Sequence, residues 1–207
     1  MNFLLVFAAI LLIIIFALNR SRPQHLIVRH GEREDATNPS WTSQHPYDTP
    51  ITENAEPFEK LFRQRKDYFA SLPPKSFILC SPFKRCIQTA KIINSRLPSP
   101  LPIIIEPGLV EYSSLEFFLG NQYFSPTEIK TRFSGVETPP PVYSPYDLEI
   151  LYRKIRTEPR IMMDELKKKL DRILSERPGA CICVAHREFI NISDPSAEDG
   201  YCSSVLI

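Results

Sequence analysis

The chain has 207 residues, enough for one well-buried domain with a small additional segment. Lys and Arg number 25 against 24 Asp and Glu, and this balance disfavours nucleic acid as a partner. The five cysteines are odd in number and irregularly spaced, which argues against a disulfide framework, and no His or Cys pair has zinc-ligand spacing. We therefore expect free thiols, no metal and no cofactor.

An apolar run opens the chain: it begins at Phe3, ends at Leu18 and contains no charged residue. As a helix it would be about 24 Å long, somewhat short of the roughly 30 Å hydrocarbon core of a bilayer. A cleaved signal peptide would need a positive n-region and small residues at the cut, and a soluble helix would show a polar face. We therefore expect residues 1–19 to form an uncleaved single-pass membrane anchor.

Two arginines, Arg20 and Arg22, follow the apolar run. Because basic flanks tend to remain cytoplasmic, they place the domain formed by residues 20–207 in the cytosol. Free cysteines agree with a reducing compartment. The opposite topology stays open, since one short anchor carries a weak orientation signal.

Beyond the anchor, short apolar runs alternate with stretches of helical periodicity, which predicts an α/β three-layer sandwich with a largely parallel sheet flanked by helices. Residues 113–145 are irregular, aromatic and proline-rich, and predict a cap or lid, although a long surface loop would have the same pattern. The other expected elements are a strand at 26–28, a loop at 34–52, a helix at 56–72, a strand at 76–80, a helix at 83–97, a strand at 102–105, a helix at 159–176, a strand at 180–185, a short irregular stretch and a strand at 201–207.

Polar side chains follow four of the predicted strands, at the point where each strand ends. They are Arg29 and His30, residues 81–85, residues 106–111, and His186. In parallel sheets, ligands bind outside the carboxyl ends of the strands. We therefore expect these four groups to meet in one site.

The residue types at these strand ends suit phosphoryl transfer. A neutral imidazole is a competent nucleophile toward phosphorus, which makes His30 the candidate nucleophile. Guanidinium groups match the oxygens of a phosphate, and a second histidine can stabilise the developing charge. A carboxylic acid must then protonate the leaving oxygen, and Glu111 is the candidate, with Asp35 or Glu32 as alternatives. The candidate phosphate ligands are Arg29, Arg33, Arg85 and His186.

Four motifs in this order resemble those of the histidine phosphatase (phosphoglycerate mutase-like) superfamily. Leu-Ile-Val-Arg-His-Gly-Glu-Arg at 26–33 resembles its signature, and Ser-Pro-Phe-Lys-Arg-Cys-Ile-Gln-Thr-Ala at 81–90 resembles its second motif. Glu-Pro-Gly-Leu-Val-Glu-Tyr at 106–112 resembles the segment of the proton donor, and Val-Ala-His at 184–186 resembles the motif of the second histidine. The Arg-His-Gly-Glu-Arg and Glu-Pro-Gly-Leu-x-Glu forms look closest to the ubiquitin-associated and SH3 domain-containing phosphatases.

This resemblance covers residues 25–207 and implies a metal-independent phosphatase that forms a phosphohistidine. It implies His30 as nucleophile, Glu111 as acid, and Arg29, Arg33, Arg85 and His186 as the phosphate pocket. The implied substrates are phosphotyrosine or small phosphate esters, and a site near a bilayer also makes lipid phosphates reachable. The aromatic residues of the cap segment could line the entrance or form a small core, and we favour the core: Tyr112, Phe117, Phe118, Tyr123 and Phe124.

Other functions remain as alternatives. A mutase would use the same histidines but would have to retain a phosphorylated sugar acid. A cysteine-based tyrosine phosphatase is set aside, because Cys80 and Arg85 are separated by four residues with no glycine between them. The alternative of a different class is a catalytically weak or inactive membrane-tethered module that only binds phosphate. Oligomeric state has no sequence signal.

Overall fold

The computed structural model describes residues 24–119, 121–177 and 179–207. The anchor expected at residues 1–19 lies outside this part of the chain. Within the described ranges, no helix has both the length and the apolar character needed to cross a bilayer.

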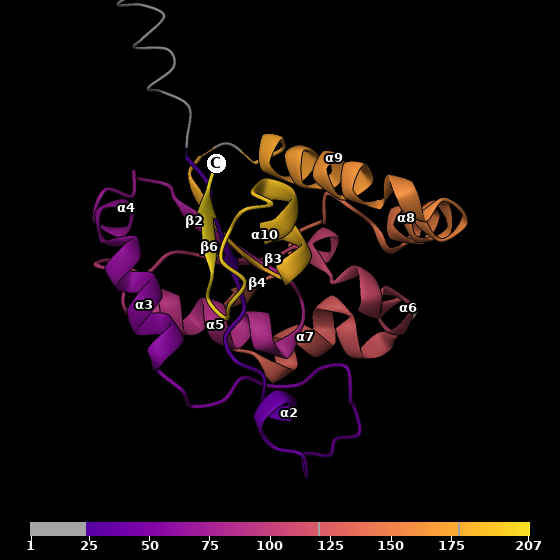
Figure 1. Cartoon of the computed structure of the whole chain (residues 1–207), viewed down its shortest axis with the longest axis horizontal. Coiled ribbons are helices and arrows are strands. Elements are labelled where there is room, and N and C mark those ends of the chain that lie inside the picture. Colours follow the sequence, from indigo (N-terminus) through magenta and orange to yellow (C-terminus); the bar gives the residue numbers. More distant parts are fainter. Residues whose placement is uncertain (1–23, 120, 178) are drawn as a thin grey trace, which may run out of the picture.

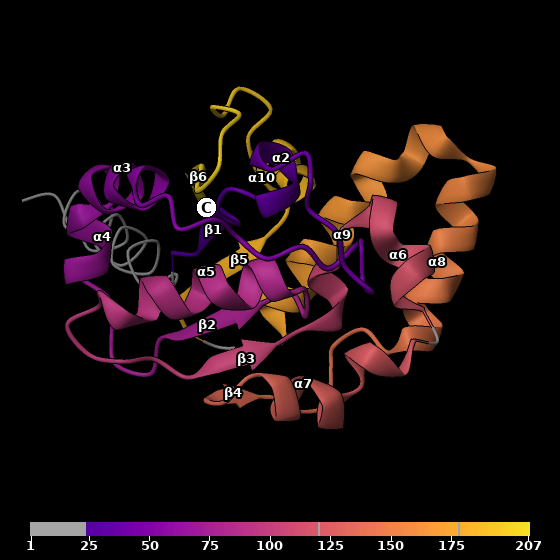
Figure 2. The ribbon, with the colours of Figure 1, turned by 90° about the horizontal axis from the view of Figure 1, so that it is seen from below.

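Six strands form one mixed sheet in the order β4-β3-β2-β5-β1-β6. Neighbouring strands pair in parallel except β6, which runs antiparallel to β1. Helices cover both faces (Figure 1; Figure 2), so the expected α/β architecture with a largely parallel sheet is confirmed. The strands are β1 (Leu26–Arg29), β2 (Phe77–Cys80), β3 (Ile103–Ile105), β4 (Val136–Glu137), β5 (Cys181–Ala185) and β6 (Ser204–Leu206).

One face of the sheet is covered by α3 (Glu56–Gln64), α4 (Lys66–Ala70) and α5 (Lys84–Ser95). Because successive side chains of a strand alternate, Leu26 and Val28 of β1 point into this layer, where they pack with Phe58 and Ile87. The helix expected at 56–72 is broken in two at Arg65. The backbone dihedral angles of Arg65 lie outside the helical region, and its side chain donates a hydrogen bond to Ser204 of β6.

The opposite face is covered by α9 (Met162–Ser175) and α10 (Arg187–Ser193). Ile27 of β1 points into this layer and packs with Leu166, Ile173 and Phe189. The prediction of an irregular stretch after His186 is wrong, because residues 187–193 are helical. The helix spans two turns, too few for periodicity to be visible, and it is held by the burial of its apolar side chains against the sheet.

Residues 113–145 contain several short elements and do not all stand apart from the core. Val136 of β4 and Ile129 of α7 join the core on the α5 side of the sheet, which corrects the expectation of a segment outside it. Phe118 and Phe124 of the remainder are buried in a separate small core, to which Phe83 and Leu148 from outside the segment also belong. The elements are η2 (Tyr112–Ser114), α6 (Leu115–Phe118), η3 (Gln122–Phe124), α7 (Pro126–Arg132) and β4.

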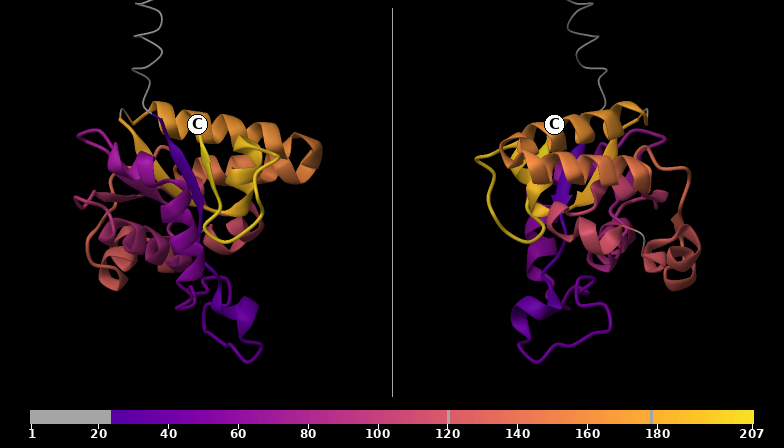
Figure 3. Two further views of the ribbon diagram at one scale, coloured as in Figure 1. Left: turned by 60° about the vertical axis from the view of Figure 1, so that its left-hand side comes forward. Right: turned by 90° about the vertical axis from the view of Figure 1, so that its right-hand side faces the viewer.

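A helix not expected from the sequence, α8 (Pro145–Thr157), follows this segment. It begins with a capping box between Ser144 and Asp147. The short helix η4 (Pro159–Ile161) connects α8 to α9, and α8 packs beside α9 (Figure 3). In the loop expected at 34–52, residues Glu34–Thr37 form the short helix α2. The loop and α2 project beyond the carboxyl ends of the parallel strands (Figure 3).

Candidate active site

The first two strand ends are brought together by the parallel pairing of β1 and β5. Arg29 lies opposite Ala185 in the register, so the next residues, His30 and His186, leave the sheet side by side. The His30 main-chain N–H donates to the carbonyl of Ala185 at 3.1 Å. The two imidazole centroids lie 5.4 Å apart, and both side chains are buried. The sheet therefore joins the two candidate histidines as expected.

The imidazole of His30 is held in one orientation. Its Nδ1 atom lies 2.8 Å from the carbonyl oxygen of Gly31, which can only accept, so the neutral ring carries its proton on Nδ1 and leaves the lone pair on Nε2. Burial is the largest of the causes that lower the pKa of His30 to about 3; the positive charges of Arg85, Arg29 and Arg33 also lower it, and the hydrogen bond with Gly31 opposes them. The ring is therefore neutral at physiological pH, the state in which it can act as a nucleophile.

His186 is enclosed between its neighbours. Its Nε2 lies 3.0 Å from the hydroxyl of Ser81, and its Nδ1 lies 3.4 Å from Nη2 of Arg85. Burial, followed by the charge of Arg85, holds the pKa of His186 well below its usual value. Because a guanidinium can only donate, Nδ1 accepts and Nε2–H donates to Ser81. This leaves Nδ1 as the ring nitrogen on the side of Arg85.

Arg85 lies at the start of α5, and its side chain is only 1% exposed. Its Nη1 donates to the carbonyl of Tyr47 at 2.9 Å, and its Nη2 donates to the carboxylate of Glu111 at 2.9 Å. The same Glu111 oxygen accepts from the hydroxyl of Ser114 at 3.1 Å. The guanidinium thus places the candidate acid beside the two histidines, and ties it to the projecting loop.

The other two candidate arginines stand around His30. Arg29 donates to Asp199 at 3.0 Å and lies 4.7 Å over the ring of Tyr201. Arg33 forms an ion pair with Asp35. Both charges act on the imidazole of His30, so they belong to the same electrostatic site even though each already has a carboxylate partner.

The alternative acids have other contacts. Asp35 is paired with Arg33, whose hydrogen bond lowers the pKa of this carboxyl group. Glu32 accepts from the hydroxyl of Thr52 and the amide of Asn54, both at 3.1 Å. Of the three carboxylic acids, Glu111 is the one bonded to Arg85.

Several groups of the site had no individual role in the sequence prediction. Ser81 stood inside a recognised motif, whereas nothing in the sequence marked the Tyr47 carbonyl or Asp199. Glu106 is fully buried, and its carboxylate accepts from the main-chain N–H of Gly108 and of Val142, both at 3.0 Å. It thereby shapes the loop that contains η1 (Pro107–Leu109) and leads to Glu111.

The expected aromatic cluster is divided between core and rim. Phe118 and Phe124 are buried as favoured, whereas Phe117 packs against the ring of Tyr47 at a centroid distance of 4.8 Å. Tyr47 is 55% exposed, and its carbonyl is the one that accepts from Arg85. One member of the cluster therefore contacts the rim of the site.

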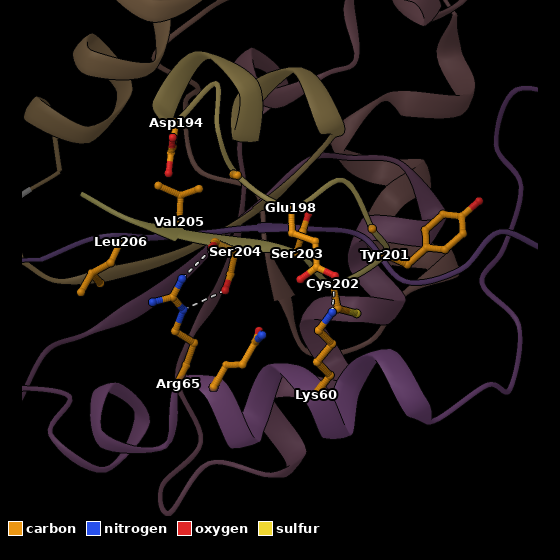
Figure 4. A pocket seen from close by; sticks show the side chains of 13 residues that line it. Lys60, Arg65, Asp194, Glu198, Tyr201, Cys202, Ser203, Ser204, Val205 and Leu206 are labelled. Atoms are coloured by element: carbon orange, nitrogen blue, oxygen red, sulfur yellow. Dashed lines mark hydrogen bonds and ion pairs between the residues drawn. The ribbon is translucent and has the colours of Figure 1, made fainter.

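A separate cleft of about 550 Å³ runs beside β6. Figure 4 shows Arg65 reaching Ser204, and Lys60 meeting Glu198 across the cleft. These contacts, from Lys60 of α3 and from Arg65 between α3 and α4, bind the segment 194–206, whose Asp199 and Tyr201 contact Arg29. The contacts across the cleft therefore stabilise a segment that borders the site, and none of the candidate catalytic residues lines the cleft itself.

The described residues contain no group of three or more His, Cys, Asp or Glu side chains placed to hold a metal ion. The sequence matches the profile of the histidine phosphatase superfamily (branch 1) over residues 25–193. The chain belongs to this superfamily. No curated protein matches it significantly.

Several solved structures are similar to this histidine phosphatase superfamily member. An ecdysone phosphate phosphatase from Bombix mori, in complex with tungstate, has a TM-score of 0.55 and 18% identity over 89% of this chain and 88% of its own. A phosphoserine phosphatase from Entamoeba histolytica has a TM-score of 0.42 and 16% identity, covering 89% of both chains. A phosphoglycerate mutase from Bacillus anthracis has a TM-score of 0.46 and 17% identity, covering 90% of this chain and 89% of its own.

The ecdysone phosphate phosphatase, with a TM-score above 0.5 at 18% identity, shows a shared fold alone. The match to the family over residues 25–193 confirms the expected membership of the superfamily. The comparisons do not single out the ubiquitin-associated and SH3 domain-containing branch. Superfamily membership is consistent with an enzyme that acts on phosphate monoesters.

Proposed function

We propose that the protein hydrolyses phosphate monoesters through a phosphohistidine on His30. The observation that carries this proposal is the imidazole of His30, buried and neutral, with Nδ1 committed to Gly31 and Nε2 free to attack. A module that only binds phosphate needs the arginines but has no use for an oriented neutral nucleophile.

In the first step, Nε2 of His30 forms a bond to phosphorus as the ester P–O bond breaks. Arg29, Arg33 and Arg85 neutralise the charge on the phosphoryl oxygens, and His186 completes the pocket from the other side of His30. The departing oxygen takes a proton from Glu111. The products are the free alcohol or phenol and a phosphoryl group on His30.

In the second step, water replaces His30 on phosphorus. Glu111, now ionised, accepts a proton from the water as its oxygen bonds to phosphorus and the N–P bond breaks. Inorganic phosphate leaves, and the imidazole and the carboxylic acid return to their starting states. All protons in the cycle pass through Glu111, so no metal is needed to activate the water.

We propose phosphotyrosine, or a small-molecule or lipid phosphate monoester, as the substrate. Support for an aryl group comes from Tyr47, whose exposed ring stands on Phe117 beside the Arg85 contact. The branch of ubiquitin-associated and SH3 domain-containing phosphatases remains part of the proposal, on the strength of the motifs at 29–33 and 106–111.

The test uses the full chain in detergent micelles, with p-nitrophenyl phosphate and a chelator, beside a His30→Ala variant. We expect turnover by the wild type and none by the variant, together with a phosphorylated wild-type protein trapped by acid quench. Equal rates in the two proteins would sink the mechanism. A folded wild type that binds inorganic phosphate without turnover would instead support a binding module.

We also propose that residues 1–19 anchor the protein in a membrane with its site in the cytosol, on the strength of the uncharged run between Phe3 and Leu18 and the arginines after it. Carbonate extraction of cell membranes tests the anchor: retention in the pellet is expected, and release into the supernatant would contradict it. Protease protection of intact vesicles tests the orientation.

A further inference from the structure

Glu188 lies in the first turn of α10, two residues after His186, and none of the proposed chemical steps uses it. Its Oε1 accepts a hydrogen bond of 2.8 Å from the main-chain N–H of Tyr112. Tyr112 is the residue directly after Glu111 and the first of η2, where main-chain N–H groups lack partners within the helix. One side chain thus links the turn that carries the second histidine to the segment that carries the proton donor.

The surroundings of Glu188 favour its role as a fixed acceptor. Lys169 of α9 is 2% exposed, and its ammonium lies 5.0 Å over the ring of Phe189, the next residue of α10. Burial raises the pKa of Glu188, and the positive charge of Lys169 opposes that rise. The positive charge of Lys169 favours the ionised carboxylate of Glu188, which is a stronger hydrogen-bond acceptor than the neutral acid.

The segment around Glu111 is fixed on its other side by different contacts. Glu106 binds the start of the loop, and Val110 is buried directly before Glu111. The carboxylate of Glu111 contacts Arg85 and Ser114, neither of which belongs to α10. The Glu188 bond is what ties the main chain after Glu111 to α10.

Geometry matters here because proton donation depends on the placement of the acid. A misplacement of about 1 Å can cost about 10²-fold in rate. We propose that Glu188 is a positioning residue, which holds the Glu111–Tyr112 main chain in register with His186 so that Glu111 can protonate the leaving oxygen. This inference rests on the proposed hydrolysis and on Glu111 as its acid.

The experiment compares two aryl phosphates that differ in their need for a proton. Phenyl phosphate has a basic leaving group, whereas 2,4-dinitrophenyl phosphate has one that departs without protonation. The measured quantity is kcat/KM, which includes the departure of the phenol. The variants are Glu188→Met, which removes the acceptor, Glu188→Gln, which keeps an acceptor oxygen, and Asp194→Asn as a matched control at the far end of the same helix.

We expect Glu188→Met to lose roughly tenfold or more on phenyl phosphate and at most about threefold on the dinitrophenyl ester, since general acid catalysis contributes about 10²- to 10⁴-fold. Glu188→Gln should restore most of the ratio, and Asp194→Asn should keep it. If Glu188→Met fails to fold, Glu188→Asp replaces it, because its shorter side chain retains the charge but withdraws the oxygen from Tyr112.

A double-mutant cycle with Glu111→Gln decides whether Glu188 acts through the acid. In the Glu111→Gln background, the further loss caused by Glu188→Met should largely vanish. Full additivity, or equal losses on the two esters in an active enzyme, would overturn the inference while leaving the hydrolysis intact. A wild type that hydrolyses neither ester would overturn the proposed function, and the inference with it.

Discussion

The imidazole rings of His30 and His186 lie 5.4 Å apart in an edge-to-face arrangement, although the two residues are far apart in the sequence. The parallel register of β1 with β5 produces this pairing, and the two rings are then oriented differently. His30 donates through Nδ1 to Gly31, whereas His186 faces Ser81 through Nε2. One ring therefore offers Nε2 to a substrate, and the other presents Nδ1 on the side of Arg85.

The buried neutral state of His30 predicts a loss of stability in acid. Its pKa is near 6.5 in the unfolded chain and about 3 in the folded one, so the unfolded state binds the extra proton first as pH falls. The contribution of His30 is complete above pH 6.5 and is lost progressively toward pH 3. The loss is about 1.4 kcal/mol of unfolding free energy for each pH unit within this window.

Urea unfolding at pH 7 and pH 5 checks this expectation in the wild type and in His30→Asn. The variant should lose less stability than the wild type between the two pH values, because it lacks the group that titrates. An identical loss in both proteins would mean that His30 is not buried in its neutral form. Both measurements belong at one salt concentration.

Arg85 binds one main-chain carbonyl and one side-chain carboxylate, and these two contacts predict a large loss of activity in Arg85→Lys. A lysine ammonium cannot serve the Tyr47 carbonyl, the Glu111 carboxylate and a phosphate oxygen with the fixed fork of a guanidinium. We expect kcat/KM to fall by about 10²-fold or more and inhibition by inorganic phosphate to weaken.

Arg96→Lys is the matched control, because this arginine stands just after α5 and contacts Glu59 at the surface. Its kinetics should match those of the wild type. If Arg85→Lys also retained full activity and normal inhibition by phosphate, Arg85 would not be a phosphate ligand.

Gly31 tests how tightly the nucleophile's loop is packed. A Cβ at this position would lie 3.0 Å from Cζ of Phe58 and 3.4 Å from Cγ2 of Ile51, both of which pack into the core. Gly31→Ala should therefore cost about 1–3 kcal/mol of stability through overpacking. It should also lower activity, because the carbonyl that orients His30 belongs to the same residue.

Shortening the neighbour should relieve this strain. Thermal unfolding of Gly31→Ala, Phe58→Leu and the double variant would form a double-mutant cycle. We expect the double variant to lose less stability than the sum of the losses in the two single variants. Simple additivity would show that Phe58 does not limit the space at Gly31.

The cysteines should be inert in the folded protein. All five are buried with free thiols, and burial raises the pKa of Cys86 and of Cys181 to about 12. Because the thiolate is the reactive form, a disulfide reagent should label none of the five in native buffer and all of them in denaturant. Rapid labelling of a thiol in the native protein would contradict the burial.

Much of the fold was readable from sequence periodicity. The strands at β1, β2, β3 and β5 are short apolar runs bounded by polar or proline-rich residues, and helices α5 and α9 show a clear apolar face. The missed elements are the helix α8 and the short elements α10 and β4. Both α10 and β4 are too short for a periodic signal, and packing against the sheet holds them in place.

The sequence alone determined which chemical groups this protein holds at its strand ends: His30, His186, Arg85 and Glu111 stand in recognisable local motifs. Their geometry was decided by the tertiary structure. The nitrogen that each histidine exposes depends on partners distant in the chain or on a folded main chain, and the Glu188 bond to Tyr112 joins segments that no local pattern connects. Sequence spacing specifies which residues follow a strand, whereas hydrogen bonds and burial across the fold determine their orientation and charge.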